Sequence, residues 1–211
     1  ALPPAPAEGR AVSLEQVLAA REARVRRQRE ALTRFECPVL SLTLVTPGPV
    51  KDGPTPRALM EAALQTLEAL FRTHAWPVSH LELHLQATGP EAILAVETGA
   101  LALKRAASGL EDAHPLGRLW DLDVIDPEQG SLSRRELGLP PRRCLLCGAE
   151  AHACARSRAH PLPALLAAIE ERLRAYRRAR CKGPRPGGGR SGAPGPAEGG
   201  GAHPEAGSRG P

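Results

Sequence analysis

The order of strand-like and helix-like segments between residues 39 and 126 is the feature that most restricts the fold. Apolar residues recur every second position in four segments and every three or four positions in two others. The strand-like segments are residues 39–46, 81–86, 92–97 and 120–126, and the helix-like segments are residues 55–75 and 101–112. Their order, β-α-β-β-α-β, is typical of a ferredoxin-like split βαβ unit. We therefore predict an α+β fold with an antiparallel sheet that carries its helices on one face.

Further elements are expected around this core. Residues 131–136 follow a turn and should pair with the last strand as a hairpin. An N-terminal helix is predicted over residues 13–32, where Ser13 and Gln16 form a capping-box pattern. A C-terminal helix is predicted over residues 161–180 from its regular apolar stripe. The core is thus flanked by a helix at each end.

The two ends of the chain differ from this domain in composition. Residues 1–12 and 182–211 are dominated by Gly, Pro and Ala, and side chains this small bury little apolar surface. Such segments do not offset their ordering entropy, so we expect them to be disordered. The predicted organisation is a disordered N-terminal segment (1–12), one domain (13–181) and a disordered Gly/Pro-rich tail (182–211).

Two aspartates stand at alternate positions of the strand-like segment WDLDV. Because side chains of a strand point alternately to opposite faces, Asp121 and Asp123 share one face and Trp120, Leu122 and Val124 share the other. Mg²⁺ prefers oxygen ligands and is often held by one or two carboxylates together with substrate phosphates. The spacing alone fits either a magnesium site or a half-exposed strand with an acidic outer face.

A cluster of cysteines follows the predicted sheet. Cys144 and Cys147 form a Cys-x-x-Cys half-site, and Cys154 comes shortly afterwards, with His152 or His160 as a fourth ligand. Tetrahedral Zn²⁺ is bound by such thiol and imidazole groups. Three unlinked thiols in a loop explain the pattern equally well. The chain has five cysteines, and an odd number argues against a secreted disulfide framework, so we expect a cytoplasmic protein.

Charge and aromatic content narrow the range of partners. The net charge of the 211-residue chain is only +5, and aromatic residues make up 2%, which leaves few stacking platforms for a nucleic acid. No apolar run is long enough for a membrane span. Arginines cluster at the end of each flanking helix, and we expect four of them to contact an acidic protein. These are Arg26, Arg27, Arg177 and Arg178.

Several ordered motifs carry a resemblance to a known family. They are LTLVTPGPVKDG (42–53), ATGPEA (87–92), HPLGRLWDLDV (114–124) and LSRRELGLPPRRCLLC (132–147). Together they closely resemble apo-citrate lyase phosphoribosyl-dephospho-CoA transferase, also called holo-citrate lyase acyl-carrier-protein synthase. The resemblance runs from about Val12 to Arg178, so it implies that residues 13–181 form a nucleotidyltransferase domain.

The resemblance implies a specific reaction. Its donor is 2'-(5''-triphosphoribosyl)-3'-dephospho-CoA, and its acceptor is a serine of the apo acyl-carrier subunit of citrate lyase. Diphosphate leaves, and the prosthetic group remains on the carrier. Chemistry of this kind needs positioning and neutralisation of developing negative charge, to which Mg²⁺ contributes.

The resemblance also suggests which residues form the site. Asp121 and Asp123 would bind Mg²⁺ and act on the incoming serine, and Arg118 would bind phosphate oxygens. The other candidates are glycines and basic residues that would contact the donor: Gly48, Lys51, Gly89, Gly117, Arg134, Arg135, Arg142 and Arg143. At least half of the basic residues are expected to form surface ion pairs instead.

Two other functions fit parts of the sequence. The first is the equivalent transferase that loads the carrier subunit of malonate decarboxylase. The second is a non-enzymatic basic module that binds acidic proteins. Incubating the protein with the donor, Mg²⁺ and each apo carrier separates the three, because only the correct acceptor gains mass.

Overall fold

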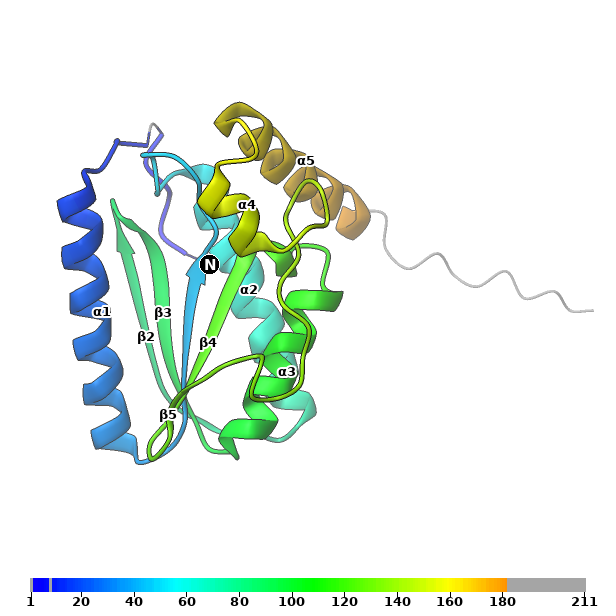
Figure 1. Ribbon diagram of the computed structural model, residues 1–211. Coiled ribbons are helices and arrows are strands. Elements are labelled where there is room, and N and C mark those ends of the chain that lie inside the picture. Colours follow the sequence, from blue (N-terminus) through cyan, green and yellow to red (C-terminus); the bar gives the residue numbers. More distant parts are fainter. Residues whose placement is uncertain (1, 8, 182–211) are drawn as a thin grey trace, which may run out of the picture.

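The computed structural model describes residues 2–7 and 9–181, which form a five-stranded antiparallel sheet with five α-helices (Figure 1). The strands are β1 (Val39–Leu44), β2 (Val78–Gln86), β3 (Gly89–Val96), β4 (Trp120–Asp126) and β5 (Gly130–Leu132). The helices are α1 (Leu14–Phe35), α2 (Pro54–Thr73), α3 (Ala100–Ala113), α4 (Ala151–Ser157) and α5 (Leu162–Cys181), with one 3-10 turn, η1 (Gly117–Leu119). The predicted α+β class and antiparallel sheet are confirmed. The predicted disordered tail lies outside the described residues.

The sheet has the strand order β2-β3-β1-β4-β5, so β1 lies at its centre and is flanked by β3 and β4. Strand β5 is shorter than the predicted hairpin partner at residues 131–136. It ends at Leu132 because the next residues form a turn, in which the Ser133 backbone N–H donates to the Glu136 carboxylate at 2.7 Å. Only the last three residues of β4 therefore have a partner on that side.

Helices cover both faces of the sheet, whereas the sequence predicted helices on one face only. Figure 1 shows α1 along one side, with α2 and α3 along the other. The C-terminal half of α1 packs Ala31 and Phe35 against Val39, Ile93 and Ala95. The central strands β1 and β3 carry buried apolar residues on both faces, so a helix is needed on each side.

Helix α1 begins as predicted, with a capping box between Ser13 and Gln16. Several of its apolar side chains, however, face the solvent and not the sheet. Its apolar residues Leu14, Leu18 and Val25 are 74%, 47% and 41% exposed. The middle of α1 instead turns Arg24, Arg27 and Gln28 toward the sheet. These three apolar residues therefore lie on the outer surface of the molecule.

The chain between β5 and α5 lies outside the sheet and buries few apolar side chains. No residue from Ser133 to Ala168 is buried, and α4, which the sequence did not predict, has none. Helix α5 packs on α2 through Ile169 and Leu173. None of the helices among residues 2–7 and 9–181 is both long and apolar enough to cross a membrane.

Candidate active site on strand β4

Asp121 and Asp123 lie on the face of β4 that is turned toward α1. Their cross-strand neighbours on β1 are Thr43 and Ser41, and the Ser41 hydroxyl accepts a hydrogen bond of 2.8 Å from Gln28 of α1. The alternate residues of β4 are buried on the opposite face: Trp120, Leu122 and Val124. The alternation of WDLDV thus separates an acidic face from a core face.

The two carboxylates lie within electrostatic range of each other and remain open to solvent, since Asp123 is exposed and the Asp121 side chain is 45% exposed. Nearby protein atoms partly desolvate Asp123, and this effect, followed by the charge of Asp121, raises its pKa. A cation placed between the two would relieve this repulsion. In the described part of the chain, these aspartates do not join a third His, Cys, Asp or Glu ligand. Any Mg²⁺ here would therefore complete its coordination with phosphate oxygens and water.

A buried glutamate on β3 ties α1 to the sheet near these aspartates. Glu91 is 3% exposed and accepts hydrogen bonds from Arg24, at 2.7 Å, and from Arg27. Burial lowers the pKa of Arg24, and the charges of Asp123 and Asp121 oppose that shift. Arg24 thus lies within electrostatic range of both aspartates and is oriented by Glu91. Arg27 is committed to the same carboxylate and is not part of the outer surface.

The half of β4 that carries the aspartates has no strand beyond it, and side chains satisfy its backbone. The Leu122 N–H donates to the Glu111 carboxylate at 2.9 Å, and the Leu122 carbonyl accepts from Lys104 at 3.0 Å. The Trp120 carbonyl accepts from the Arg142 guanidinium. Glu111 and Lys104, both on α3, are only 5% and 4% exposed. These bonds replace a neighbouring strand and fix β4 in place.

Two of the predicted donor-binding arginines belong to an ion-pair cluster along this edge. Arg142 lies 2.7 Å from the Asp121 carboxylate and 3.7 Å from that of Glu111. Arg134 pairs with Glu111 at 3.1 Å and with Asp112 at 2.5 Å. Burial raises the pKa of Glu111, and the charge of Arg142 opposes that rise. The charge of Arg134 is matched within the protein, while Arg142 connects the cluster to Asp121.

The loop after β1 and the β2–β3 turn lie against each other. Gly89 has a φ of +110°, and a Cβ at this position would lie 3.4 Å from the Lys51 carbonyl oxygen. Burial, and after it the charge of Arg21, lowers the pKa of Lys51. Gly48 has a φ of +83°, and its added Cβ would come within 3.0 Å of Leu162. Glycine is needed at both turns because other residues rarely adopt these angles.

Gly117 and Arg118 form the turn before β4 and have different environments. Gly117 is buried, and a Cβ there would lie 2.1 Å from the Leu110 carbonyl oxygen, so packing against α3 accounts for glycine without any contact to the donor. Arg118 donates to the Arg143 carbonyl. Burial, and after it the charge of Arg142, lowers the pKa of Arg118. Arg118 and Arg142 therefore lie within electrostatic range of each other.

Arg118 separates two cavities large enough for a small ligand. A cavity of about 680 Å³, which we call the β1-side cavity, extends from Arg118 to Gly48 and Leu162. A cavity of about 550 Å³, the α3-side cavity, contains Arg134, Arg142 and Arg143. Cys144 and Leu145 line both cavities. Arg135, on the turn after β5, is exposed.

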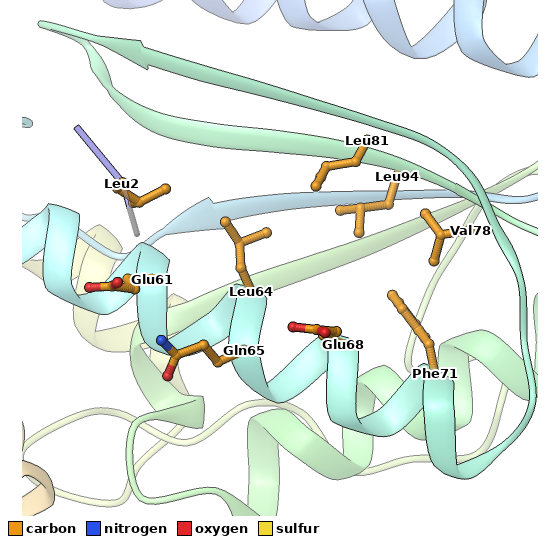
Figure 2. Close-up of a pocket in the computed structure, with 9 residues that line it drawn as sticks. All are labelled: Leu2, Glu61, Leu64, Gln65, Glu68, Phe71, Val78, Leu81 and Leu94. Carbon is orange, nitrogen blue, oxygen red and sulfur yellow. The ribbon is translucent and has the colours of Figure 1, made fainter.

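A third hollow, of about 340 Å³, lies across the sheet from the aspartates (Figure 2). In Figure 2, Leu64 and Phe71 of α2 face Leu81 and Leu94 of the strands. Glu61 and Glu68 line it as well, and none of its nine lining residues is Lys or Arg. An apolar and acidic hollow does not suit a triphosphate, so it is not the donor site.

The four predicted zinc ligands come together next to the β1-side cavity. One ligand atom from each of Cys144, Cys147, Cys154 and His160 lies within 4.8 Å of all the others. Burial raises the pKa of Cys144, but backbone N–H groups of Cys147 and Leu146 and the neighbouring thiols outweigh it and lower that pKa to about 6. The structure therefore provides a Cys/His cluster with the composition of a metal site.

Comparison with known proteins agrees with this geometry. The family model of apo-citrate lyase phosphoribosyl-dephospho-CoA transferase matches residues 12–176. The chain belongs to this family. A transferase of that name from Escherichia coli (strain UTI89) is 43% identical over 163 residues, which cover 77% of this chain and 89% of the relative. The same identity and coverage are found for the transferase of Shigella boydii serotype 18. The resemblance in the sequence motifs is thus confirmed.

Sequence reasoning missed several residues that build this family member's site. Glu111 and Lys104 lie seven positions apart on α3, so the helical period places them on one face, which was a usable signal. Glu91 falls within the ATGPEA motif, but only the structure shows that it binds Arg24 and Arg27. Nothing in the sequence indicated that these pairs join α1 to the sheet.

Proposed function

We propose that this protein transfers the phosphoribosyl-dephospho-CoA group from its triphosphate precursor to a serine of the apo acyl-carrier subunit of citrate lyase. The observation that carries the proposal is family membership over residues 12–176 together with the paired aspartates beside Arg118 and Arg142. The serine oxygen forms a bond to the α-phosphorus, the bond from that phosphorus to the leaving diphosphate breaks, and an aspartate carboxylate takes the serine proton.

The residues around β4 suit the charge that this reaction develops. Arg118 lies close enough to Arg142 for the charge of Arg142 to disfavour that of Arg118, and an incoming phosphate would relieve that repulsion. Guanidinium groups bind phosphate oxygens in a bidentate manner. Lys51 lies against the glycine turn at Gly89, and Gly48 lines the β1-side cavity together with Arg118. Stabilisation of the developing charge accounts for most of the catalysis expected here.

We propose Mg²⁺ as the ion that Asp121 and Asp123 hold. The fit rests on their oxygen ligands and on their position on one face of β4. Desolvation, and after it the charge of Asp121, raises the pKa of Asp123, and a bound cation would offset the second of these effects. When bound, Mg²⁺ would neutralise charge on the phosphoryl oxygens. The thiol-rich cluster at Cys144 favours zinc instead, because Mg²⁺ prefers oxygen ligands.

We propose that the carrier subunit docks on the outer face of α1. This face carries the exposed apolar residues Leu18 and Val25 between the exposed arginines Arg21, Arg26 and Arg29. An acidic helix with an apolar stripe complements such a surface, and rim charges mainly govern its association rate. Helix α5, whose arginines were also predicted to contact the carrier, packs on α2 in the opposite layer.

We further propose that residues 39–126 belong to the ferredoxin-like type. The succession β1-α2-β2-β3-α3-β4, and the positions of β3 and β4 on either side of β1, support that assignment. Strand β5 and helix α1 are then additions to this unit.

The direct test mixes the purified protein with the triphosphate donor, Mg²⁺ and the apo carrier of citrate lyase, and measures the intact mass of the carrier. The proposal predicts a gain equal to the prosthetic group, and no gain for a carrier whose acceptor serine is replaced by alanine. Modification of only the malonate decarboxylase carrier would assign the alternative substrate. Modification of neither carrier would refute the activity.

The aspartates are tested with Asp123→Asn, and with Asp126→Asn as a matched control at the far end of the same strand. Asn keeps the shape of Asp but not its charge, so Asp123→Asn should reduce the rate on the order of a hundredfold. The control should retain near-normal turnover. Thermal unfolding should show that Asp123→Asn folds normally, because the change removes one of two repelling charges. Normal turnover of Asp123→Asn at saturating Mg²⁺ would exclude it from the site.

A further inference from the structure

The segment between β5 and α5 has a defined shape but no apolar core of its own. None of its residues from Ser133 to Pro161 is buried, although it contains α4 and lines both cavities. Only Leu145 packs, partly buried, against the main core. A short segment without a core generally needs a disulfide or a metal ion to hold one conformation.

The Cys/His cluster lies in the middle of this segment and has the dimensions of a tetrahedral site. Its four ligand atoms fall within 4.8 Å of one another, and the Cys147 and Cys154 sulfurs are 3.4 Å apart. A zinc ion with Zn–S bonds near 2.3 Å places its sulfurs about 3.8 Å apart. The observed spacing therefore needs only small adjustments to surround an ion.

The turn that carries the first two cysteines directs a backbone N–H group at the Cys144 sulfur. The Leu146 backbone N–H donates to the Cys144 sulfur at 3.5 Å. Gly148, directly after Cys147, has a φ of +72°, which turns the chain back so that the Cys144 N–H can donate to the Ala149 carbonyl at 2.6 Å. An N–H aimed at sulfur stabilises its thiolate form, which is the form that binds a metal.

His160 gives an independent sign that an ion belongs in this cluster. Its Nε2 atom is buried and has no hydrogen-bond partner among the described residues. A buried polar atom without a partner is costly and calls for a specific explanation. Coordination of a metal satisfies this nitrogen, and no other group in the cluster does so.

We propose that Cys144, Cys147, Cys154 and His160 form a structural zinc site. Three thiolates and one imidazole select zinc over Mg²⁺, and four protein ligands leave no open position for catalysis. The site would join three separate parts of the segment: the Cys-x-x-Cys turn, helix α4 and the chain entering α5.

The zinc site also acts on the proposed active site through the arginines that precede it. Arg142 accepts a hydrogen bond at its carbonyl from Ala151, at the start of α4, at 2.8 Å. Its side chain binds Asp121, and the carbonyl of Arg143 accepts from Arg118. Zinc therefore positions the arginines that border both cavities. Only this effect on the active site rests on the proposed function; the zinc site itself does not.

The test measures zinc directly, in full-length protein purified under reducing conditions without chelators. Elemental analysis should find one zinc per chain. Replacement by Co²⁺ should give sulfur-to-cobalt charge-transfer absorption and the visible bands of a tetrahedral ion. His160→Cys should retain the metal, because it supplies a fourth thiolate, whereas His160→Ala should reduce occupancy. Cys181→Ser, an exposed cysteine outside the cluster, is the matched control and should keep one zinc.

Two outcomes would overturn the proposal. One is a folded wild-type chain that is free of metal and does not take up Zn²⁺ or Co²⁺. The other is a Cys147–Cys154 disulfide found by mass analysis in place of the metal. If His160→Ala unfolds, chelation of the wild-type protein replaces it, and limited proteolysis should then cut first between residues 133 and 160. Asp123→Asn should bind zinc normally, so zinc binding and transferase activity are tested separately.

Discussion

Replacing Gly117 by alanine tests whether this glycine serves packing or donor binding. The new Cβ would lie 2.1 Å from the Leu110 carbonyl oxygen and 2.8 Å from that of Glu111. Both are backbone atoms in the last turn of α3, where the His114 N–H donates to the Leu110 carbonyl at 3.0 Å. Neither atom can rotate away, so the turn before β4 must move relative to the helix.

The size of the effect follows from that contact. Ordinary van der Waals contact for a Cβ begins at 3.4 Å, so the two elements must separate by 3.4 − 2.1 = 1.3 Å along this direction. Overpacking of a tightly packed site typically costs 1–3 kcal/mol, and contact with backbone places this case at about 3 kcal/mol. For a domain of this size, that lowers the melting temperature by roughly 6–12 °C.

Gly109→Ala is the matched control, since Gly109 lies on α3 in an exposed position with nothing within 4 Å of its added Cβ. Alanine is favoured over glycine in a helix by about 0.5–1 kcal/mol, so this variant should melt slightly higher than wild type. Thermal unfolding followed by circular dichroism compares the three proteins. A Gly117→Ala protein that melts like wild type but loses donor affinity would refute the packing argument.

Two further predictions concern charge. Burial raises the pKa of Glu111, so the folded protein favours the protonated form of this side chain. Its contribution to stability is therefore fully present below the ordinary Glu pKa of about 4.3. That contribution is lost as the pH rises through the raised pKa of the folded protein. The stability of wild type relative to Glu111→Gln, measured by urea unfolding, should therefore fall with rising pH, and a constant difference would contradict the shift. On the outer face of α1, Arg26→Glu should raise the KM for the carrier several-fold and leave the donor KM unchanged, while Arg177→Glu on α5 is the control. A rise in the donor KM alone would place Arg26 at the phosphate site.

Local sequence pattern predicted most of the elements correctly. The alternation around Leu81 and around Trp120 marked strands that the structure contains, and the capping box at Ser13 marked the start of α1. These signals are local because each depends on a few neighbouring residues. Helix α4 was missed because seven residues without buried apolar positions give no helical period to detect.

The contacts of the site depended on tertiary structure and could not be predicted in the same way. The sequence placed Arg134 among donor ligands because it is basic and close to the aspartates along the chain. Its partners, Glu111 and Asp112, come from α3, and this pairing depends on how α3 packs beside β4. The cysteine ligands were predictable as types, but only folding brings His160 to them.

The orientation of α1 explains why one helix can contribute to two surfaces. A helix on a sheet normally turns its apolar side inward, but Leu18 and Val25 of α1 face outward. Here the inward side meets a sheet face that carries Glu91 and Ser41, so arginines and Gln28 are needed there to satisfy buried polar groups. The apolar residues are left outside as a consequence. The polar face that forms the candidate site thus also creates the exposed stripe on which we expect the carrier to dock.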